Sequence, residues 1–219
     1  MMKIPAFPML RLLLAASIAL AAAVPANADN QDGTKIPTKE GHRVRLIYYL
    51  SEVSGQQEAD AIVQAVKAIK TVTTASVDTN REYLKISFDS HEVSYHQVAQ
   101  AIADAGAKFD KKYDPRVVIT IPDYSKPDVM PKIKAIFADE KFKPWIVIEP
   151  VDAAKGVFFV HFLPLIPDPA KTGTQGFNGG YLTHPIHMVP PTGLALPFKY
   201  SAEDSPEIPV YQPASGKQI

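Results

Sequence analysis

The sequence contains no cysteine among its 219 residues. It therefore forms no disulfide, cannot be anchored through a lipid on an N-terminal cysteine, and offers no thiolate to a zinc or blue-copper centre. The folded chain has to be held together by packing, and an apolar content of 46% is enough for an ordinary core. Any soft metal ion that the chain binds must be held by imidazole or thioether ligands.

The sequence also lacks an excess of charge of either sign and lacks the common catalytic signatures. It carries 23 basic and 23 acidic residues, interspersed along the chain. A nucleic-acid-binding protein is expected to show a basic patch, so we expect no nucleic-acid partner. There is no G-x-S-x-G elbow, H-E-x-x-H helix, P-loop or G-x-G-x-x-G turn, and we expect that the protein is not an enzyme.

No apolar run reaches the ~20 residues that a membrane-spanning helix needs. The most prominent run covers residues 12–24, follows Lys3 and Arg11, and precedes Ala26-Asn27-Ala28. This three-part pattern predicts a signal peptide over residues 1–28, cleaved near Ala28. Its removal leaves 21 basic and 23 acidic residues, a net charge of −2. We therefore expect an exported protein, periplasmic or secreted, without a membrane span after cleavage.

The patterned part of the chain begins near residue 43, after a polar stretch at 29–42 that we expect to be a flexible tether. Period-2 and helical-period apolar patterns then alternate, and Ser94 with Gln97 forms a capping box before the second helix. The expected elements are a strand at 43–50, a helix at 59–69, strands at 72–77 and 84–88, a helix from 94, and a strand at 108–113. This β-α-β-β-α-β order over residues 43–113 predicts a ferredoxin-like domain.

A second, incomplete copy of this pattern is expected over residues 114–203. Its elements are a strand at 117–121, a helix at 129–137, and strands at 145–149 and 157–163. No second amphipathic helix is expected, because the chain becomes rich in proline and glycine from Pro164 onward. Alternating side chains at 194–200 could supply a fourth strand, and residues 204–219 are expected to be a tail. The predicted fold class is α+β, a ferredoxin-like unit followed by an incomplete ferredoxin-like βαββ unit with a proline-rich extension.

Residues 43–109 resemble the heavy-metal-associated domains of copper chaperones and metal-transporting ATPases. The resemblance runs through the helix Ala61-Ile62-Val63-Gln64-Ala65-Val66-Lys67-Ala68-Ile69, the two strands that follow it, and Gln100-Ala101-Ile102-Ala103-Asp104-Ala105-Gly106. It implies a ferredoxin-like fold. The CxxC motif of that family falls by position near Gln56 and Ala59, neither of which can hold a soft metal ion. The resemblance therefore implies the fold without its usual metal site, and such a module can serve as a scaffold or docking surface.

The best remaining candidates for metal ligands are His184, His187 and Met188. Two imidazoles three residues apart beside a thioether are a suitable half-site for copper, or for zinc, in a chain without cysteine. His161, on the last strand of the second unit, is a candidate third ligand, and Met130 is a more remote one. The alternative is that His184 and His187 are surface histidines in a proline-rich loop.

Two functions therefore remain open from the sequence. One is a metal-binding accessory protein, with copper as the most suitable ion. The other is a metal-free protein–protein interaction module, in which the open sheet faces and the loop at residues 164–191 contact a protein partner. Aromatic side chains on the predicted strands either fill the core or face such a partner.

Overall fold

The computed structural model describes residues 36–38 and 41–201. The predicted signal peptide and tail lie outside the described residues. Along the described part of the chain the elements are β1 (Ile36–Thr38), β2 (Gly41–Tyr49), α1 (Gln56–Lys67), β3 (Thr74–Asp78), β4 (Tyr83–Asp89), α2 (Tyr95–Ala107), β5 (Arg116–Thr120), α3 (Met130–Phe137), β6 (Ile146–Asp152), β7 (Val157–Phe162), α4 (Gly180–His187) and β8 (Lys199–Tyr200). β1 and the start of β2 fall within residues 29–42, so strand pairing begins earlier than the predicted tether allows.

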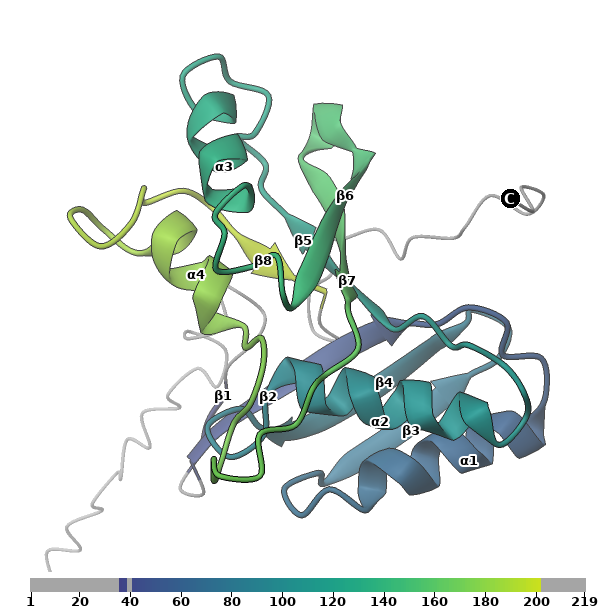
Figure 1. The fold of residues 1–219 in the computed structure, drawn as a ribbon. Coiled ribbons are helices and arrows are strands. Elements are labelled where there is room, and N and C mark those ends of the chain that lie inside the picture. Colours follow the sequence, from purple (N-terminus) through teal and green to yellow (C-terminus); the bar gives the residue numbers. More distant parts are fainter. Residues whose placement is uncertain (1–35, 39–40, 202–219) are drawn as a thin grey trace, which may run out of the picture.

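The first unit has the ferredoxin-like strand order β3-β4-β2-β5, with all neighbouring strands antiparallel. Helices α1 and α2 lie side by side on one face of this sheet (Figure 1). Their buried residues include Ile62, Val66, Val98 and Ile102, which are the apolar stripes that the sequence predicts. The capping box is confirmed: the Gln97 amide donates to Ser94 Oγ at 3.0 Å, and the Ser94 amide donates to Gln97 Oε1 at 2.8 Å.

The predicted closing strand at residues 108–113 is wrong. That segment has no strand pairing, and β5 takes the edge position instead, through the single pair Tyr49 and Arg116. The apolar side chain that suggested a strand is Tyr113, which is fully buried. It anchors an irregular segment, because its hydroxyl donates to Glu58 Oε2 at 2.9 Å on α1. The strand-like pattern at residues 108–113 thus reflects the burial of Tyr113, without any strand pairing.

The second unit also has the ferredoxin-like order, β6-β7-β5-β8, and it is more complete than the sequence suggests. The expectation that no second helix follows β7 is wrong, because α4 occupies that place. Pro185 lies inside α4, and the two histidines interrupt its apolar stripe, so the helical pattern was hidden. The predicted fourth strand is present as β8 and is shorter than residues 194–200. Strand β5 therefore belongs to both units.

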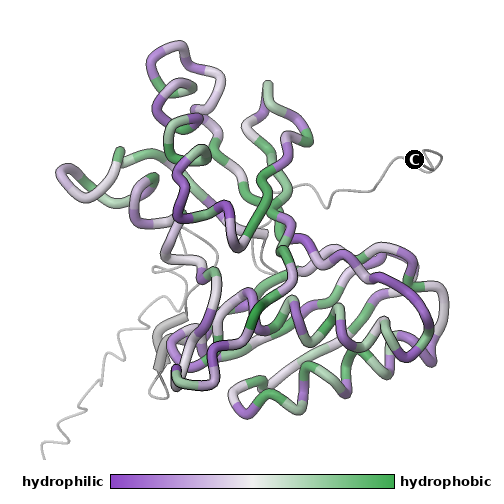
Figure 2. The backbone as a smooth tube through the Cα atoms, viewed as in Figure 1, coloured by the Kyte–Doolittle hydropathy of each residue, from purple (hydrophilic) through white to green (hydrophobic). Residues whose placement is uncertain are grey.

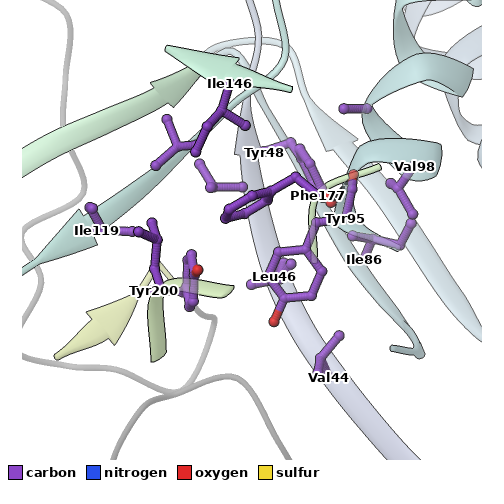
Figure 3. Close-up of a cluster of buried hydrophobic side chains, with 14 of the residues drawn as sticks. Val44, Leu46, Tyr48, Ile86, Tyr95, Val98, Ile119, Ile146, Phe177 and Tyr200 are labelled. Carbon is purple, nitrogen blue, oxygen red and sulfur yellow. Dashed lines mark hydrogen bonds between the residues drawn. The ribbon is translucent and has the colours of Figure 1, made fainter. Parts of the chain in front are cut away.

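The larger of two buried apolar clusters extends across both units, with side chains from α1, α2, α3 and α4. Figure 2 shows the hydrophobic residues running along the strands and the inner sides of the helices. Where the units meet, Tyr48, Tyr95, Phe177 and Tyr200 pack together (Figure 3). The Tyr48 hydroxyl donates to the Tyr95 carbonyl at 2.9 Å, so the buried polar end of Tyr48 has a partner. Within residues 41–201, none of the helices has the length and apolarity to span a bilayer.

Candidate functional site

Helix α4, which carries two of the predicted ligands, is fixed against α2 through its first residues. Gly179 approaches Tyr95 so closely that a Cβ atom there would lie 2.5 Å from the ring carbon Cζ. The Gly179 carbonyl accepts hydrogen bonds from Thr183 Oγ1 at 3.1 Å and from the Tyr200 hydroxyl at 2.9 Å. Asn178 Nδ2 adds a bond to the Ser90 carbonyl at 2.6 Å. The helix is therefore held at a defined position on the first unit.

The imidazole of His187 is oriented by the segment that follows α4. Its Nδ1 lies 3.1 Å from the Leu196 carbonyl oxygen. A carbonyl can only accept, so Nδ1 carries a proton, and in the neutral ring the lone pair is on Nε2. The Leu196 carbonyl is itself held in place, because the Leu196 amide donates to the Ile186 carbonyl at 2.9 Å. His187 also borders a cavity of about 460 Å³, lined otherwise by residues 195–199.

His184 and Met188 flank His187 on the same helix end. The His184 side chain is exposed, and 42% of the Met188 surface is exposed to solvent. The His184 ring lies beside the first turn of α4, where a Cβ atom on Gly180 would be 3.5 Å from its Cε1. The Ala195 amide donates to the Met188 carbonyl at 2.9 Å, which fixes the backbone at the end of the helix. Three of the four predicted ligands therefore lie on one short segment, at the end of α4 and just beyond it.

His161, the fourth predicted ligand, lies elsewhere. It sits on β7 between two carboxylates, with Nδ1 at 3.0 Å from Asp114 Oδ2 and Nε2 at 2.9 Å from Glu149 Oε2. The hydrogen bond to Asp114, followed by that to Glu149, raises the pKa of His161 above its usual 6.5, against the opposing effect of burial. Since both ring nitrogens face acceptors, the protonated ring has no lone pair for a metal ion.

A second cavity, of about 470 Å³, adjoins His161 at the junction of the two units. Its polar lining includes Asp114, Gln100 and Ser51, and Phe162 and Leu163 form part of an apolar wall. His187 does not line this cavity, and His161 does not line the cavity beside α4.

The loop in which the resemblance places a metal site is closed by an ion pair. Gln56 Nε2 donates to Asp60 Oδ1 at 2.8 Å, and Ala59 is buried. Lys111 Nζ contacts Glu58 Oε1 at 2.7 Å and the Glu52 carbonyl at 2.9 Å. The hydrogen bond from Lys111 is the main cause that lowers the pKa of Glu58 from 4.5 to about 2. A lysine ammonium therefore holds together the loop before α1.

His96, in the first turn of α2, is a buried histidine that the sequence pattern does not indicate. It is fully buried, its Nε2 donates to the Leu163 carbonyl at 2.5 Å, and its Nδ1 accepts from the Phe177 amide at 3.3 Å. Burial lowers the pKa of His96 below 6.5. Its position beside Tyr95 in the first turn of α2 gave no periodic signal, because both its partners come from a distant irregular segment.

Among residues 41–201, no group of three or more histidine, aspartate or glutamate side chains is arranged to hold a metal ion. The α4 set is of a different composition, with two imidazoles and one thioether. Imidazole and thioether together suit copper better than zinc, magnesium or calcium, because thioether sulfur is a soft ligand.

No family model matches this chain, and no curated protein matches it. Among solved structures, the CopZ metallochaperone is similar over 32% of this chain and 97% of its own, at 25% identity and a TM-score of 0.29. The match to the water-soluble region of the P-type ATPase CopA from Bacillus subtilis covers 57% of this chain and 78% of that protein's chain, at 16% identity and a TM-score of 0.33. The match to the N-terminal soluble domains of Bacillus subtilis CopA covers 59% of this chain and 84% of that protein's chain, at 17% identity and a TM-score of 0.29.

Proposed function

We propose that this chain is an exported, non-catalytic protein that binds a copper ion through His184, His187 and Met188. The observation that carries the proposal is the hydrogen bond between His187 Nδ1 and the Leu196 carbonyl. Histidines that ligate metals commonly donate their other ring N–H to a carbonyl or carboxylate, which fixes the ring and leaves the opposite nitrogen for the metal. His187 has this arrangement in a braced segment at the surface.

The donor set favours monovalent copper over zinc. Two imidazole nitrogens and a thioether sulfur provide three soft or borderline ligands, whereas zinc is bound by thiolate, imidazole and carboxylate. The protein has no thiolate with which to hold copper, so these ligands are the ones that an exported, cysteine-free chain has available. The exposure of His184 and Met188 would allow a bound ion to pass to a partner.

We further propose that residues 43–109 are a heavy-metal-associated domain whose metal-binding loop has been replaced by a salt-bridged loop. The supporting observations are the ferredoxin-like order of this unit and the contacts of Lys111 with Glu58 and with the Ser54 hydroxyl, the latter at 3.0 Å. In this proposal the first unit is a scaffold, and the ligands lie in the second unit.

The experiment is a copper-binding titration of residues 29–219 in competition with a chromogenic Cu(I) chelator. We expect sub-micromolar binding, a loss of at least about 100-fold in a His184→Ala/His187→Ala double variant, and a smaller loss in Met188→Leu. His91→Ala, at an exposed position outside α4, is the matched control and should bind as the parent does. Equal binding by the parent and the double variant, or no binding by either, would refute the proposal.

A metal-free docking function is the second candidate, because apolar side chains are exposed around the same helix. Tyr181 is 49% exposed and Val189 is 68% exposed, beside Met188. Exposed aromatic and methionine side chains are enriched at protein interfaces. Two results together would favour this function over the first. The parent chain would show no copper affinity, and the Tyr181→Ser/Val189→Ser double variant would lose binding to the protein partner.

A further inference from the structure

The segment that joins β7 to α4, residues 163–179, passes over the first turn of α2 (Figure 1). Residues 169–174 of this segment are all exposed. The chain returns to the core at Phe177, which is fully buried and in ring contact with Phe142 and Phe162. Since α4 begins at Gly180, shortly after Phe177, the start of this helix is anchored by that return.

His96 contacts this segment near both of its ends. The Nε2 atom of its ring lies 2.5 Å from the Leu163 carbonyl oxygen, and Nδ1 accepts a hydrogen bond from the Phe177 amide at 3.3 Å. The His96 amide donates in turn to the Phe177 carbonyl at 3.1 Å. The ring also packs against Gly176, where a Cβ atom would lie 2.5 Å from Nδ1. A single buried side chain therefore holds the segment on α2.

These contacts require a neutral ring. A carbonyl can only accept and an amide can only donate, so Nε2 carries the one proton and Nδ1 carries the lone pair. A second proton, on Nδ1, would face the N–H of Phe177, and that hydrogen bond would be lost. The rings of Trp145 and Phe162 pack beside the imidazole, with centroid distances of 5.9 and 5.6 Å. A charged ring at this fully buried position would therefore lack both water and a second acceptor.

The charged groups around His96 do not compensate a positive ring. The acidic and basic side chains on the elements that pack against it have other partners: Asp168 with Lys171, Asp139 with Lys141, Glu140 with Lys143, Asp104 with Gln100, and His161 with Asp114 and Glu149. Within the described part of the chain, none of them shifts the pKa of His96. Burial is the main cause that lowers this pKa below 6.5, and the hydrogen bond to the Leu163 carbonyl opposes it.

We propose that His96 is a proton-sensitive latch for residues 163–179. Uptake of a proton on Nδ1 breaks the hydrogen bond from the Phe177 amide and favours a locally open state, in which the segment has left the first turn of α2. In this open state the charged ring reaches water and the Phe177 side chain leaves the core, while the sheet stays intact. The start of α4 then loses its Phe177 anchor. This inference does not depend on the copper site.

The latch has a defined pH dependence. The closed state binds the proton less readily than the open state, in which the ring has its ordinary pKa of 6.5. Opening therefore takes up a proton below pH 6.5, and the open fraction rises by up to about ten-fold for each unit of pH, down to the pKa of the closed state. Above pH 6.5 the ring is neutral in both states, so the open fraction does not change with pH.

Hydrogen–deuterium exchange of the Phe177 amide in residues 29–219 measures the open fraction. The protection factor, which is corrected for the intrinsic pH dependence of exchange, should fall by at least about three-fold from pH 6.5 to pH 5.5 and stay constant from pH 7.5 to pH 8.5. It should also lie below the protection factor of the Leu46 amide, in the middle of β2, because the segment opens without the sheet. A Phe177 protection factor that is independent of pH, or equal to that of Leu46, would overturn the latch.

His96→Gln assigns this pH dependence to the ring. Glutamine keeps an N–H for the Leu163 carbonyl but does not titrate, so the change in Phe177 protection between pH 6.5 and pH 5.5 should disappear. His91→Gln, at an exposed histidine before α2, is the matched control and should keep it. Nitrogen-15 spectra of the parent give a test that needs no substitution, and we expect the His96 ring to be protonated on Nε2 at pH 8. A ring protonated on Nδ1, or a pH dependence that persists in His96→Gln, would contradict the proposal.

Discussion

Ser201 and Val118 are joined by two hydrogen bonds: the Ser201 amide donates to the Val118 carbonyl at 2.7 Å, and the Val118 amide donates to Ser201 Oγ at 3.2 Å. The same hydroxyl donates to the Ile47 carbonyl at 3.0 Å. β2 and β5 form only one register pair, between Tyr49 and Arg116. Ser201 therefore occupies the gap where these strands diverge, and it satisfies backbone groups of both.

Ser201→Ala is expected to destabilise the fold by about 1–3 kcal/mol, because it leaves the buried Val118 amide without its acceptor and the Ile47 carbonyl with one bond fewer. Chemical denaturation measures the loss as a lower midpoint. Ser76→Ala, at an exposed position on the edge strand β3, is the control and should stay within about 0.5 kcal/mol of the parent. Similar midpoints for both variants would show that the junction does not depend on this hydroxyl.

Gly179→Ala is expected to destabilise the protein by about 1–3 kcal/mol, since the added methyl would lie 2.5 Å from Tyr95 Cζ and 2.6 Å from its hydroxyl oxygen. Gly180→Ala is a matched control one residue later, where the nearest atom is 3.5 Å away, at the His184 ring. We expect the control to change stability by less than about 1 kcal/mol. Thermal unfolding of the two variants in parallel checks this, and equal losses would argue against close packing at residue 179.

Stability is expected to fall in acid through Glu58. Its folded-state pKa of about 2 lies below the ordinary 4.5, so its contribution is present above pH 4.5 and is lost as pH falls toward 2. Glu58→Gln removes this contribution. The difference in unfolding free energy between parent and variant should be large at pH 6 and shrink toward pH 2. A difference that stays constant with pH would show that the Lys111 pair contributes no such linkage.

His161 should stabilise the fold in the opposite pH range. Its pKa is raised by Asp114 and Glu149, so its contribution is fully present below pH 6.5 and is lost as pH rises through the folded-state pKa. His161→Gln is therefore expected to destabilise the protein more at pH 5.5 than at pH 9. A nuclear magnetic resonance titration of the His161 ring provides the direct check, and a midpoint at or below 6.5 would exclude this role.

The sequence predicted those parts of the fold that local patterns encode. The stripe containing Ile62 and Val66, and the capping box of Ser94 and Gln97, were confirmed because each depends on neighbouring residues. The place of β5 in both units was not predictable in this way, because its pairing with β2 depends on residues as distant as Ser201. Helix α4 was missed because its stability comes from contacts of Gly179 with Tyr95 and Tyr200, which leave no amphipathic pattern.

The candidate site was predictable only to the extent that its members are close in sequence. His184, His187 and Met188 were identified together because they are adjacent along the chain. The Leu196 carbonyl that orients His187 could not be inferred, since a backbone acceptor has no sequence signature. His161 was grouped with them by residue type, yet the fold places it beside Asp114 and Glu149, whose carboxylates stabilise the protonated imidazole ring. Residue type alone does not distinguish a metal ligand from a partner in an ion pair.

The shared strand β5 has a consequence for how such a chain can be inherited. Two complete ferredoxin-like units placed end to end would require eight strands for themselves, whereas here the last strand of one unit is the first strand of the other. A gene fragment that ends before Arg116 would encode a β2 with an open hydrogen-bonding edge, and one that begins after Thr120 would encode a sheet without its central strand. Either unit can therefore be duplicated, exchanged or lost as a complete sheet only if β5 is included with it, so a recombination boundary that keeps both units intact has to lie outside Arg116–Thr120.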